Sequence, residues 1–442
     1  MRERGWAFLT STREHIGREA KAPPMSCRVC ESHRLLSVLD LGATPPCEKF
    51  LPNEALDLVE ATYPLHLRVW ENCLLLQLPA LITPEETFTE YAYFSSYSDS
   101  WVAHAGRFVE SAVERLKLNE NSFVVEVASN DGYLLKHVVD AGVRCLGIEP
   151  SVNVSAAAVE RGLPTLTAFL DEATATAVRA EHGPADLVAA NNVYAHIPDV
   201  LGFTRGLRTL LADDGWLSIE VHHALNLMAL AQFDTIYHEH FQYYTVASAT
   251  NALATAGLTV VDVEQLPTHG GSIRLWARPD AVAGPPSTRV TEVLAAEAQA
   301  GLHDVTGYVG LRARVERQRH DLLRYLLDCR AEGKRVVGYG APGKGNTMLN
   351  YCGIRTDLIE YLVDRNPYKH GMFTPGARLP IHPVERLDKD RPNVIVVLPW
   401  NLEPELTAQL AYTAEWGAEL VYPLPDLHVV DPRNRNIRRL AS

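Results

Sequence analysis

Short apolar runs alternate along much of this chain with segments whose apolar residues recur at helical spacing, starting near residue 104. Apolar runs bounded by turn residues are typical of buried strands, and strands that alternate with helices build parallel sheets covered on both faces. The pattern therefore predicts a doubly wound parallel α/β sheet. Its expected strands are residues 122–128, 144–148, 163–166, 186–190 and 215–220, and its first helices are residues 105–118 and 133–141.

A second α/β unit is expected after a Pro- and Gly-containing linker at residues 281–286. Residues 288–332 have apolar residues at helical spacing, which predicts a helical stretch. Further strands are expected at residues 334–339, 359–364 and 393–398. Residues 25–90 are punctuated by prolines instead, and they predict a small irregular β module.

The chain is thus expected to have four parts. Residues 1–24 predict a disordered leader, and Met25, which stands close to the first cysteine motif, is an alternative start. An N-terminal module, a central domain and a C-terminal α/β domain follow, and their expected bounds are residues 25–100, 101–285 and 286–442.

The charge balance excludes two classes of partner. With 41 Lys and Arg against 54 Asp and Glu, the net charge is −13, which argues against binding to nucleic acid or to an anionic membrane. No run reaches the ~18 apolar residues of a membrane span, and the first residues lack the apolar core of a secretory signal. We therefore expect a cytoplasmic protein, and we expect it to be a monomer.

The turn at residues 126–132 joins an expected strand to an expected helix and predicts a nucleotide-binding site. Its glycine allows close approach of a ligand, and Glu149 ends the next strand about 20 residues on, where nucleotide-binding folds place an acid on the ribose. An ordinary turn is the alternative, and the missing GxGxxG pattern argues against NAD. The candidate cofactor-binding residues are Glu126, Ala128, Asn130, Gly132, Glu149 and Asn191.

Two segments carry groups that can exchange protons. His196 follows the fourth expected strand, at the carboxyl end where ligands bind in such sheets, although a structural hydrogen bond is the alternative. Tyr237, His238, Glu239 and His240 are consecutive, and they favour acid–base chemistry. Metal binding is a second interpretation of this cluster, but its spacing is not that of the HExxH zinc motif. A solvated polar turn is the third.

The cysteines predict a local metal site rather than disulfides, because the chain has 7 of them, an odd number. Cys27 and Cys30 form half of a zinc site, and Cys73 is the third candidate ligand. Trp70 occupies the position where a second pair would have its first cysteine. The fourth ligand would then be water or a neighbour such as His33, His66 or Glu71, and a site that has lost its metal is the alternative.

A second glycine-rich turn spans residues 338–347, between an expected strand and helix. Its free backbone amides and Lys344 predict a pyrophosphate cradle, and Asp364 closes the next strand. A glycine-rich packing turn is the alternative.

Together these motifs resemble the S-adenosylmethionine-dependent sugar C-methyltransferases, which act on dTDP-linked 4-keto-6-deoxyhexoses in antibiotic sugar biosynthesis. The matching stretches are residues 27–30, 41–46, 73–77, 91–96, 126–135, 147–151, 195–199, 237–240, 269–274 and 338–346. The resemblance implies a zinc-binding N-terminal module, a central class I, Rossmann-like methyltransferase domain that binds S-adenosylmethionine, and a C-terminal Rossmann-like domain that helps to hold the nucleotide sugar.

The resemblance also implies roles for single residues. His240 matches the general base, with a pKa expected near the ~6.5 of free imidazole. Tyr91, His196, Tyr237 and Glu239 match its active-site companions, and Cys27, Cys30 and Cys73 match ligands of a structural zinc. The expected substrate-binding residues are Arg274, Tyr339, Lys344 and Asn346.

The expected reaction is methylation of a carbon next to the C4 ketone, with C3 favoured and C5 possible. Two alternatives remain open at this point. One is an NAD-dependent nucleotide-sugar dehydrogenase or epimerase, which the missing Tyr-x-x-x-Lys pair argues against. The other is a non-catalytic binding protein with a degenerate methyltransferase domain, which the intact cluster at residues 237–240 argues against.

Overall fold

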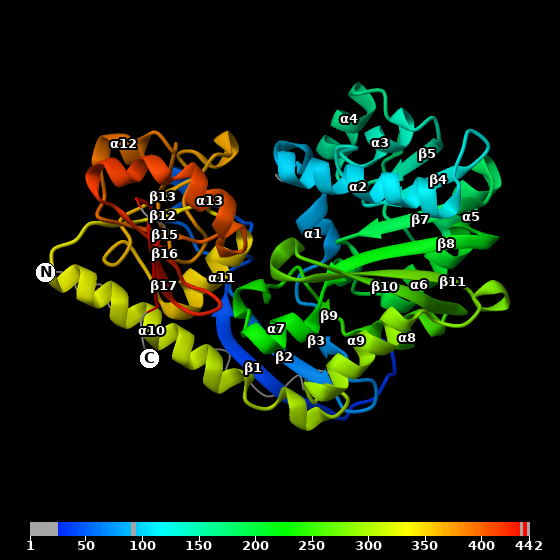
Figure 1. Ribbon diagram of the computed structural model, residues 1–442, viewed down its shortest axis with the longest axis horizontal. Helices are drawn as coiled ribbons and strands as arrows, with labels where there is room; N and C mark the ends of the chain where they lie inside the picture. The colour runs from blue at the N-terminus through cyan, green and yellow to red at the C-terminus, as the bar shows by residue number, and fades with distance from the viewer. Residues whose placement is uncertain (1–24, 90–93, 434–435, 440–442) are drawn as a thin grey trace, which may run out of the picture.

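Two α/β lobes and a smaller sheet beneath them make up the protein (Figure 1). The computed structural model describes residues 25–89, 94–433 and 436–439. The predicted leader and Tyr91 lie outside these residues. None of the helices in the described part of the chain is long and apolar enough to cross a membrane.

The N-terminal module is built on a four-stranded antiparallel sheet. Alternate residues of its second strand, such as Leu65 and Leu67, are fully buried, as expected of a strand with one face on a core. Its strand order is β1 (Leu35–Thr44), β2 (Tyr63–Trp70), β3 (Leu76–Gln77) and β9 (Gln242–Tyr243), and α1 (Pro84–Phe88) follows β3. Strand β9 begins two residues after His240, so the sheet anchors the segment of that histidine against the N-terminal module.

The central lobe contains the predicted parallel sheet, with strand order β10-β11-β8-β7-β4-β5-β6. Its parallel strands are β4 (Phe123–Val127), β5 (Arg144–Ile148), β6 (Thr165–Leu166), β7 (Ala185–Asn191) and β8 (Leu211–His222). Its helices are α2 (Asp99–Leu116), α3 (Leu135–Asp140), α4 (Val152–Glu160), α5 (Glu172–His182), α6 (Val200–Leu210), α7 (Ala224–Leu230) and α8 (Val246–Ala254).

The sequence did not predict the antiparallel pair that extends this sheet, β10 (Leu258–Leu266) and β11 (Ser272–Pro279). These strands carry charged residues at sheet positions, among them Asp262, Glu264 and Arg274. Glu264 pairs with Arg274, and Asp262 pairs with Arg115 and Arg289 from neighbouring helices. A pattern of hydrophobicity alone does not detect strands whose charges are paired in this way.

The C-terminal lobe has the strand order β14-β13-β12-β15-β16-β17-β18, with the last two strands antiparallel. Its strands are β12 (Val336–Tyr339), β13 (Leu362–Val363), β14 (Ile381–His382), β15 (Val394–Val397), β16 (Glu419–Tyr422), β17 (His428–Asp431) and β18 (Asn436–Arg439). Its helices are α10 (Leu311–Ala331), α11 (Gly343–Cys352), α12 (Arg386–Asp390) and α13 (Glu403–Gln409), whereas the preceding helix α9 (Thr288–Gln299) packs on α8 and β10 of the central lobe. The predicted helical stretch 288–332 is therefore two helices, and Gly310 precedes the second with a φ of 98°.

One apolar core joins the three parts, and two further clusters of buried side chains lie mainly in the central lobe. Leu67 of β2, Phe233 of the central lobe and Val396 of β15 belong to the same cluster of buried side chains. The long helix α10 packs on β1 and on α11, and Figure 1 shows it running beneath the C-terminal lobe toward β1. This packing places α11, which follows β12, against residues Phe233–Thr235 of the central lobe.

Candidate active site

The turn after β4 has the backbone geometry of a tight ligand cradle. Ala128, Asn130 and Gly132 all have positive φ values, of 56°, 51° and 80°. Glu149, at the end of β5, fastens the turn, because its Oε2 accepts a hydrogen bond from the Asn130 amide at 2.9 Å. Its Oε1 accepts another from the amide of Ser151 at 2.8 Å. The structure thus brings together the predicted turn and the predicted acid.

Three acids meet beneath this turn, Glu126, Asp131 and Glu149. All three are buried, and burial, followed by the charges of Glu149 and Asp131, raises the pKa of Glu126 well above its ordinary value. Oε2 of Glu126 and Oδ1 of Asp131 are buried without a hydrogen-bond partner in the described part of the chain. Such atoms need donors, and the hydroxyl and ammonium groups of S-adenosylmethionine are donors of this kind.

Asn191 ends β7, the strand next to β4, and pairs with Glu220 of β8. Its Oδ1 is also buried without a partner among the described residues. The carboxyl edge of the sheet therefore presents acceptors from three neighbouring strands, which is where ligands bind in open α/β sheets.

His240 and Tyr237 form the closest polar pair of the second predicted cluster. The Tyr237 hydroxyl lies 2.8 Å from Nε2 of His240. The His196 ring, from the turn after β7, stands at 4.6 Å from the His240 ring, centroid to centroid, in an edge-on arrangement. A backbone hydrogen bond of 2.8 Å from Phe241 to Ala195 ties the two segments together. The structure thus brings together His196, Tyr237 and His240, as predicted.

The pKa of His240 differs from the expectation. Burial lowers it well below the ordinary value, and the charges of His196, His222 and His269 lower it further. Burial likewise lowers the pKa of His196 to about 4. Both rings are therefore neutral at physiological pH. The prediction of an unperturbed pKa for His240 is wrong because the ring is buried, and neighbouring imidazoles add to the effect of burial.

Glu239 points toward the N-terminal module. It is buried, and its Oε1 lies 4.0 Å from Sγ of Cys47. Burial and the charge of Glu48 raise the pKa of Glu239 to about 8, so a neutral carboxyl group is the main form at pH 7. A neutral carboxyl can donate a hydrogen bond, which a carboxylate cannot.

The predicted sugar-nucleotide residues lie at the start of α11 and at the end of β12. Nζ of Lys344 donates to Oδ1 of Asn401 at 3.1 Å. Burial lowers the Lys344 pKa, and the charge of Asp234 opposes that effect. Asn346 donates from Nδ2 to the Cys47 carbonyl at 2.6 Å, which leaves its buried Oδ1 without a partner among the described residues.

Tyr339 and Arg274 are held by other protein groups. The Tyr339 hydroxyl accepts from Nε2 of Gln409 at 2.9 Å. Arg274 is buried, and it donates to Glu220 at 2.6 Å and to Glu264 at 3.2 Å. The guanidinium of Arg274 is thus occupied by two carboxylates of the protein itself.

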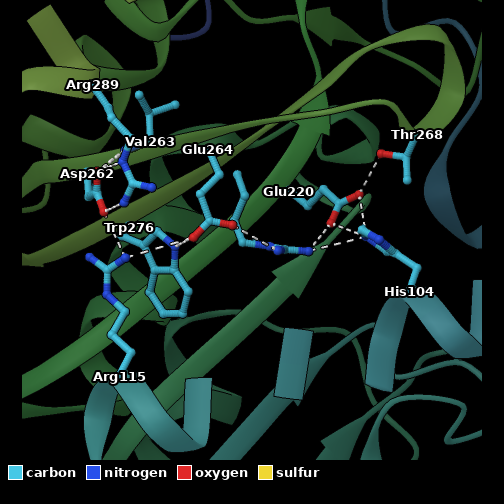
Figure 2. A network of polar contacts seen from close by, with 10 residues as sticks. His104, Arg115, Glu220, Asp262, Val263, Glu264, Thr268, Trp276 and Arg289 are labelled. Carbon is cyan, nitrogen blue, oxygen red and sulfur yellow. Dashed lines mark hydrogen bonds and ion pairs between the residues drawn. The ribbon is translucent and has the colours of Figure 1, made fainter. Parts of the chain in front are cut away.

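The polar network around Arg274 fixes the charge of Glu220. Burial opposes its ionisation, but a hydrogen bond from His104 and the charge of Arg274 outweigh burial and lower the Glu220 pKa to about 2. His104 lies 2.9 Å from Oε2 of Glu220 (Figure 2). Helix α2, which carries His104, is thereby joined to the end of β8.

Several residues at this site were not predicted. His222 ends β8, Asp234 stands shortly before Tyr237, and Trp400 follows β15. Nε1 of Trp400 donates to Oδ2 of Asp234 at 2.6 Å, which joins the two lobes directly. The rule that placed His196 after a strand would also have found His222, whereas a contact between Asp234 and Trp400 has no local signal.

The predicted metal ligands do meet in space. Potential ligand atoms of Cys27, Cys30 and Cys73 all lie within 4.8 Å of one another, and Sγ of Cys27 is 3.4 Å from Sγ of Cys73. Three sulfurs this close fit three corners of a tetrahedral zinc site. Trp70 is fully buried beside them.

The suggested fourth ligands have other partners. His33 lies 3.3 Å from the Met25 carbonyl, His66 contacts Ser37 and Arg68, and Glu71 pairs with Arg34. None of the three belongs to the cluster of potential ligands that the described residues form.

Comparison with known proteins separates the alternatives left open by the sequence. Three family models match in succession: a zinc binding domain over residues 27–88, a methyltransferase domain over residues 101–263, and a C-methyltransferase C-terminal domain over residues 267–425. These matches favour a methyltransferase over a dehydrogenase or a non-catalytic binding protein.

Two solved methyltransferase structures match about two fifths of this chain. Magnesium protoporphyrin IX methyltransferase from Synechocystis PCC 6803, with bound SAH, is 17% identical, and the match covers 40% of this chain and 82% of that chain with a TM-score of 0.33. An S-adenosylmethionine-dependent methyltransferase from Mesorhizobium loti is 14% identical, over 40% of this chain and 99% of that chain, with a TM-score of 0.32. Likeness at this level is too weak to say anything about substrate.

A curated relative matches almost the whole chain. The C-methyltransferase NovU from Streptomyces niveus is 34% identical over 408 residues, which are 92% of this chain and 97% of that protein. Because identity of this order extends through all three matched parts, the chain belongs to the S-adenosylmethionine-dependent sugar C-methyltransferase family.

Proposed function

We propose that this enzyme methylates a carbon next to the C4 ketone of a dTDP-4-keto-6-deoxyhexose, with C3 as the favoured position and C5 as the alternative. The observation that carries this proposal is the 2.8 Å contact between Tyr237 and His240, close to His196 at the carboxyl edge of the central sheet. A neutral imidazole beside a phenol suits the removal of a weakly acidic proton next to a ketone.

In this mechanism a nitrogen of His240 takes the proton from the carbon next to the ketone, and the electron pair moves into an enolate. Hydrogen bonds from Tyr237, His196 and the neutral carboxyl of Glu239 would stabilise the enolate oxygen. S-adenosylmethionine supplies an electrophilic methyl group when it is bound. The substrate carbon would form the new bond to that methyl group while the methyl–sulfur bond breaks, its electron pair staying on the sulfur of the departing S-adenosylhomocysteine. The proton would remain on His240 until solvent removes it.

The lowered pKa of His240 would make it a weak base in the free enzyme. Part of the lowering comes from neighbouring imidazoles, so negative charge brought in by the substrate offsets it. A pyrophosphate near Lys344 would provide such charge. The base would then gain strength when the correct substrate is bound.

The cofactor site we propose consists of the turn after β4 and the acids around it. Glu149 would bind the ribose hydroxyls, and Glu126, Ala128, Asn130, Gly132 and Asn191 would complete the site. The positive φ values of the turn and the unpartnered buried oxygens support this placement.

The nucleotide sugar would reach from this site toward the C-terminal lobe. Lys344 and Asn346, at the start of α11, are the residues we propose for the pyrophosphate, since a helix start and a cation both attract phosphate. Tyr339 and Arg274 would contribute only through the residues that they hold in place. Tyr91 remains a proposed companion of the base.

For the N-terminal module we propose one structural zinc ion held by Cys27, Cys30 and Cys73. The close approach of the three sulfurs supports it. The three cysteines take no part in the proposed proton transfer, so the ion would act on the stability of the module.

A direct experiment tests the reaction. The enzyme is incubated with dTDP-4-keto-6-deoxyglucose and S-adenosylmethionine carrying a ¹³C methyl group, and the product is examined by NMR. We expect the label on a carbon next to the ketone, with release of S-adenosylhomocysteine. Label on oxygen or nitrogen, or no transfer to any of a panel of dTDP-4-keto sugars, would contradict the proposal.

A further inference from the structure

His222 is a buried imidazole at the candidate site that the proposed mechanism does not use. It is the last residue of β8, and it pairs with Ser272 at the start of β11. Its side chain therefore stands at the carboxyl edge of the central sheet, the edge that also carries Asn191. The residue is only 7% exposed.

The hydrogen bonds of Gln232 determine which nitrogen of His222 carries the proton. Nε2 of Gln232 donates to the Gly270 carbonyl at 2.8 Å, and a carbonyl can only accept. This bond fixes the orientation of the amide, so its Oε1 is the atom that lies 2.9 Å from Nε2 of His222. An amide oxygen accepts, and Nε2 of His222 must therefore be the N–H.

The other nitrogen of His222 is consequently a bare acceptor when the ring is neutral. Nδ1 is buried, and it has no hydrogen-bond partner within the described residues. Burial, followed by the charge of Lys344, lowers the His222 pKa to about 3 against the opposing hydrogen bond of Gln232. The ring is thus neutral at physiological pH, and Nδ1 offers a lone pair that needs a donor.

The surroundings of His222 belong to the sugar end of the proposed site. The charge of His222 lowers the pKa of His240, so the two rings interact. The charges of Lys344 and His269 act in turn on His222.

Direct contacts also link His222 to the C-terminal lobe. Its partner Gln232 bonds Gly270, and the segment that contains Gly270 packs against the segment 400–402. There the Trp400 ring centroid lies 5.7 Å from Nζ of Lys344, the proposed pyrophosphate ligand.

We propose that Nδ1 of His222 accepts a hydrogen bond from a hydroxyl group of the bound hexose and makes His222 a specificity-determining residue. The inference rests on the proposed function. Ketone and phosphate oxygens cannot supply a proton to Nδ1, and the nearby cation Lys344 disfavours an ammonium group. The remaining donors of the substrate are the thymine N–H and deoxyribose hydroxyl of dTDP, which the dTDP probe below tests separately, and the hydroxyls of the hexose. A sugar that lacks the hexose hydroxyl would leave Nδ1 buried and unpaired.

Two substitutions distinguish the acceptor Nδ1 of His222 from the hydrogen bond between its Nε2 and Gln232. In His222→Gln, the amide reaches the place of Nε2 and can still donate to Gln232, but nothing replaces Nδ1. In His222→Asn, the amide stands at the place of Nδ1 and offers an oxygen there, but the contact with Gln232 is lost. His222→Gln therefore removes the acceptor and keeps the bond to Gln232, whereas His222→Asn removes that bond and keeps an acceptor.

Calorimetry in the presence of S-adenosylhomocysteine, which blocks turnover, provides the test with two probes. The probes are dTDP and dTDP-4-keto-6-deoxyglucose, whose sugar carries hydroxyls only at C2 and C3. We expect His222→Gln to bind the sugar nucleotide about 10- to 100-fold more weakly than wild type, while both bind dTDP alike. His222→Asn should bind the sugar nucleotide more tightly than His222→Gln does.

The outcomes distinguish this inference from the function on which it rests. Unchanged affinity of His222→Gln for the sugar nucleotide would overturn the inference and leave the function standing. Equal losses in both variants would also overturn it, because the contact with Gln232 would then be the important one. Wild type that binds neither probe would overturn the proposed function, and this inference with it.

Discussion

Arg274 and Glu220 form a buried ion pair between adjacent strands, with 2.6 Å between Nη2 and Oε2. The side chain of Glu220 is fully buried, and that of Arg274 is 4% exposed. A pair so far from water is stable only while both charges are present, because either charge alone would be buried without compensation. The pair therefore makes the central sheet sensitive to any loss of the Glu220 charge.

We expect Glu220→Gln to lower the free energy of unfolding by about 3–5 kcal/mol, the usual cost of breaking a buried ion pair. Urea unfolding followed by circular dichroism measures this loss. Glu264→Gln is the matched control, since Glu264 also pairs with Arg274 but is 23% exposed, and its loss should be smaller. If both substitutions lowered the free energy of unfolding equally, the polar network as a whole, and not the buried pair of Arg274 and Glu220, would be the source of the stabilisation.

The same ion pair predicts that the free energy of unfolding decreases in acid. The Glu220 pKa is lowered from 4.5 to about 2 in the folded protein, so ionised Glu220 stabilises the fold at pH values above 4.5. That contribution is lost as pH falls from 4.5 toward 2. The difference in unfolding free energy between wild type and Glu220→Gln should therefore be constant near neutral pH and shrink in this window. A difference that does not change down to pH 2 would contradict the assigned charge of Glu220.

The proposed role of Glu149, the acid at the end of β5, is tested by measuring cofactor binding. Glu149→Ala removes a charged acceptor, and we expect S-adenosylhomocysteine to bind more weakly by ~1.5–3 kcal/mol, as measured by calorimetry. Asp364→Ala is a matched control, because Asp364 accepts hydrogen bonds from the amides of Ala341 and Asn366 in a similar turn of the other lobe. An unchanged affinity in Glu149→Ala would exclude this residue from the cofactor site.

Local patterns explain which parts of this site the sequence could predict. The turn after β4 and Glu149 follow from a strand, a glycine and an acid at a known spacing, so their meeting was predictable. The contact between Trp400 and Asp234 joins residues from two lobes, and no local pattern encodes it. Such contacts depend on how the lobes pack.

The partners of Arg274 and the pKa of His240 could not be predicted from local sequence patterns either. Arg274 belongs to a matching motif, which suggested a ligand-binding role, yet its guanidinium pairs with Glu220 across the sheet. The pKa of His240 depends on imidazoles from separate segments, including His196 and His269. The sequence identifies a titratable group, but the electrostatic environment that tunes it is assembled only in the folded chain.

The cysteine cluster predicts a measurable metal content. If Cys27, Cys30 and Cys73 hold zinc, purified protein should carry about one zinc per chain, and Cys73→Ser should lower both the zinc content and the melting temperature. Cys145→Ser is the control, since Cys145 is buried in the central lobe, outside the cluster. Absence of zinc from folded, active wild type would show that three cysteines beside Trp70 do not retain the metal.

The general base is tested most directly by hydrogen exchange. With S-adenosylhomocysteine in place of the methyl donor, wild type in D₂O should exchange the proton next to the substrate ketone, provided that solvent protons reach the site. His240→Asn should bind both ligands but lose exchange, and its methylation rate should fall by about 10²–10⁴-fold, the range for general-base catalysis. Mass spectrometry of the recovered sugar nucleotide measures the exchange.

Two further variants identify the base if His240 is not the one. Tyr237→Phe removes the phenol 2.8 Å from Nε2 of His240, and we expect it to slow exchange less than His240→Asn does. His238→Asn is the control, because His238 contacts the Tyr63 carbonyl and should leave exchange unaffected. Full exchange in His240→Asn together with none in Tyr237→Phe would assign the proton transfer to the phenol. The methyl-transfer reaction would stand in that case, and the lone pair of His240 would serve only to orient Tyr237.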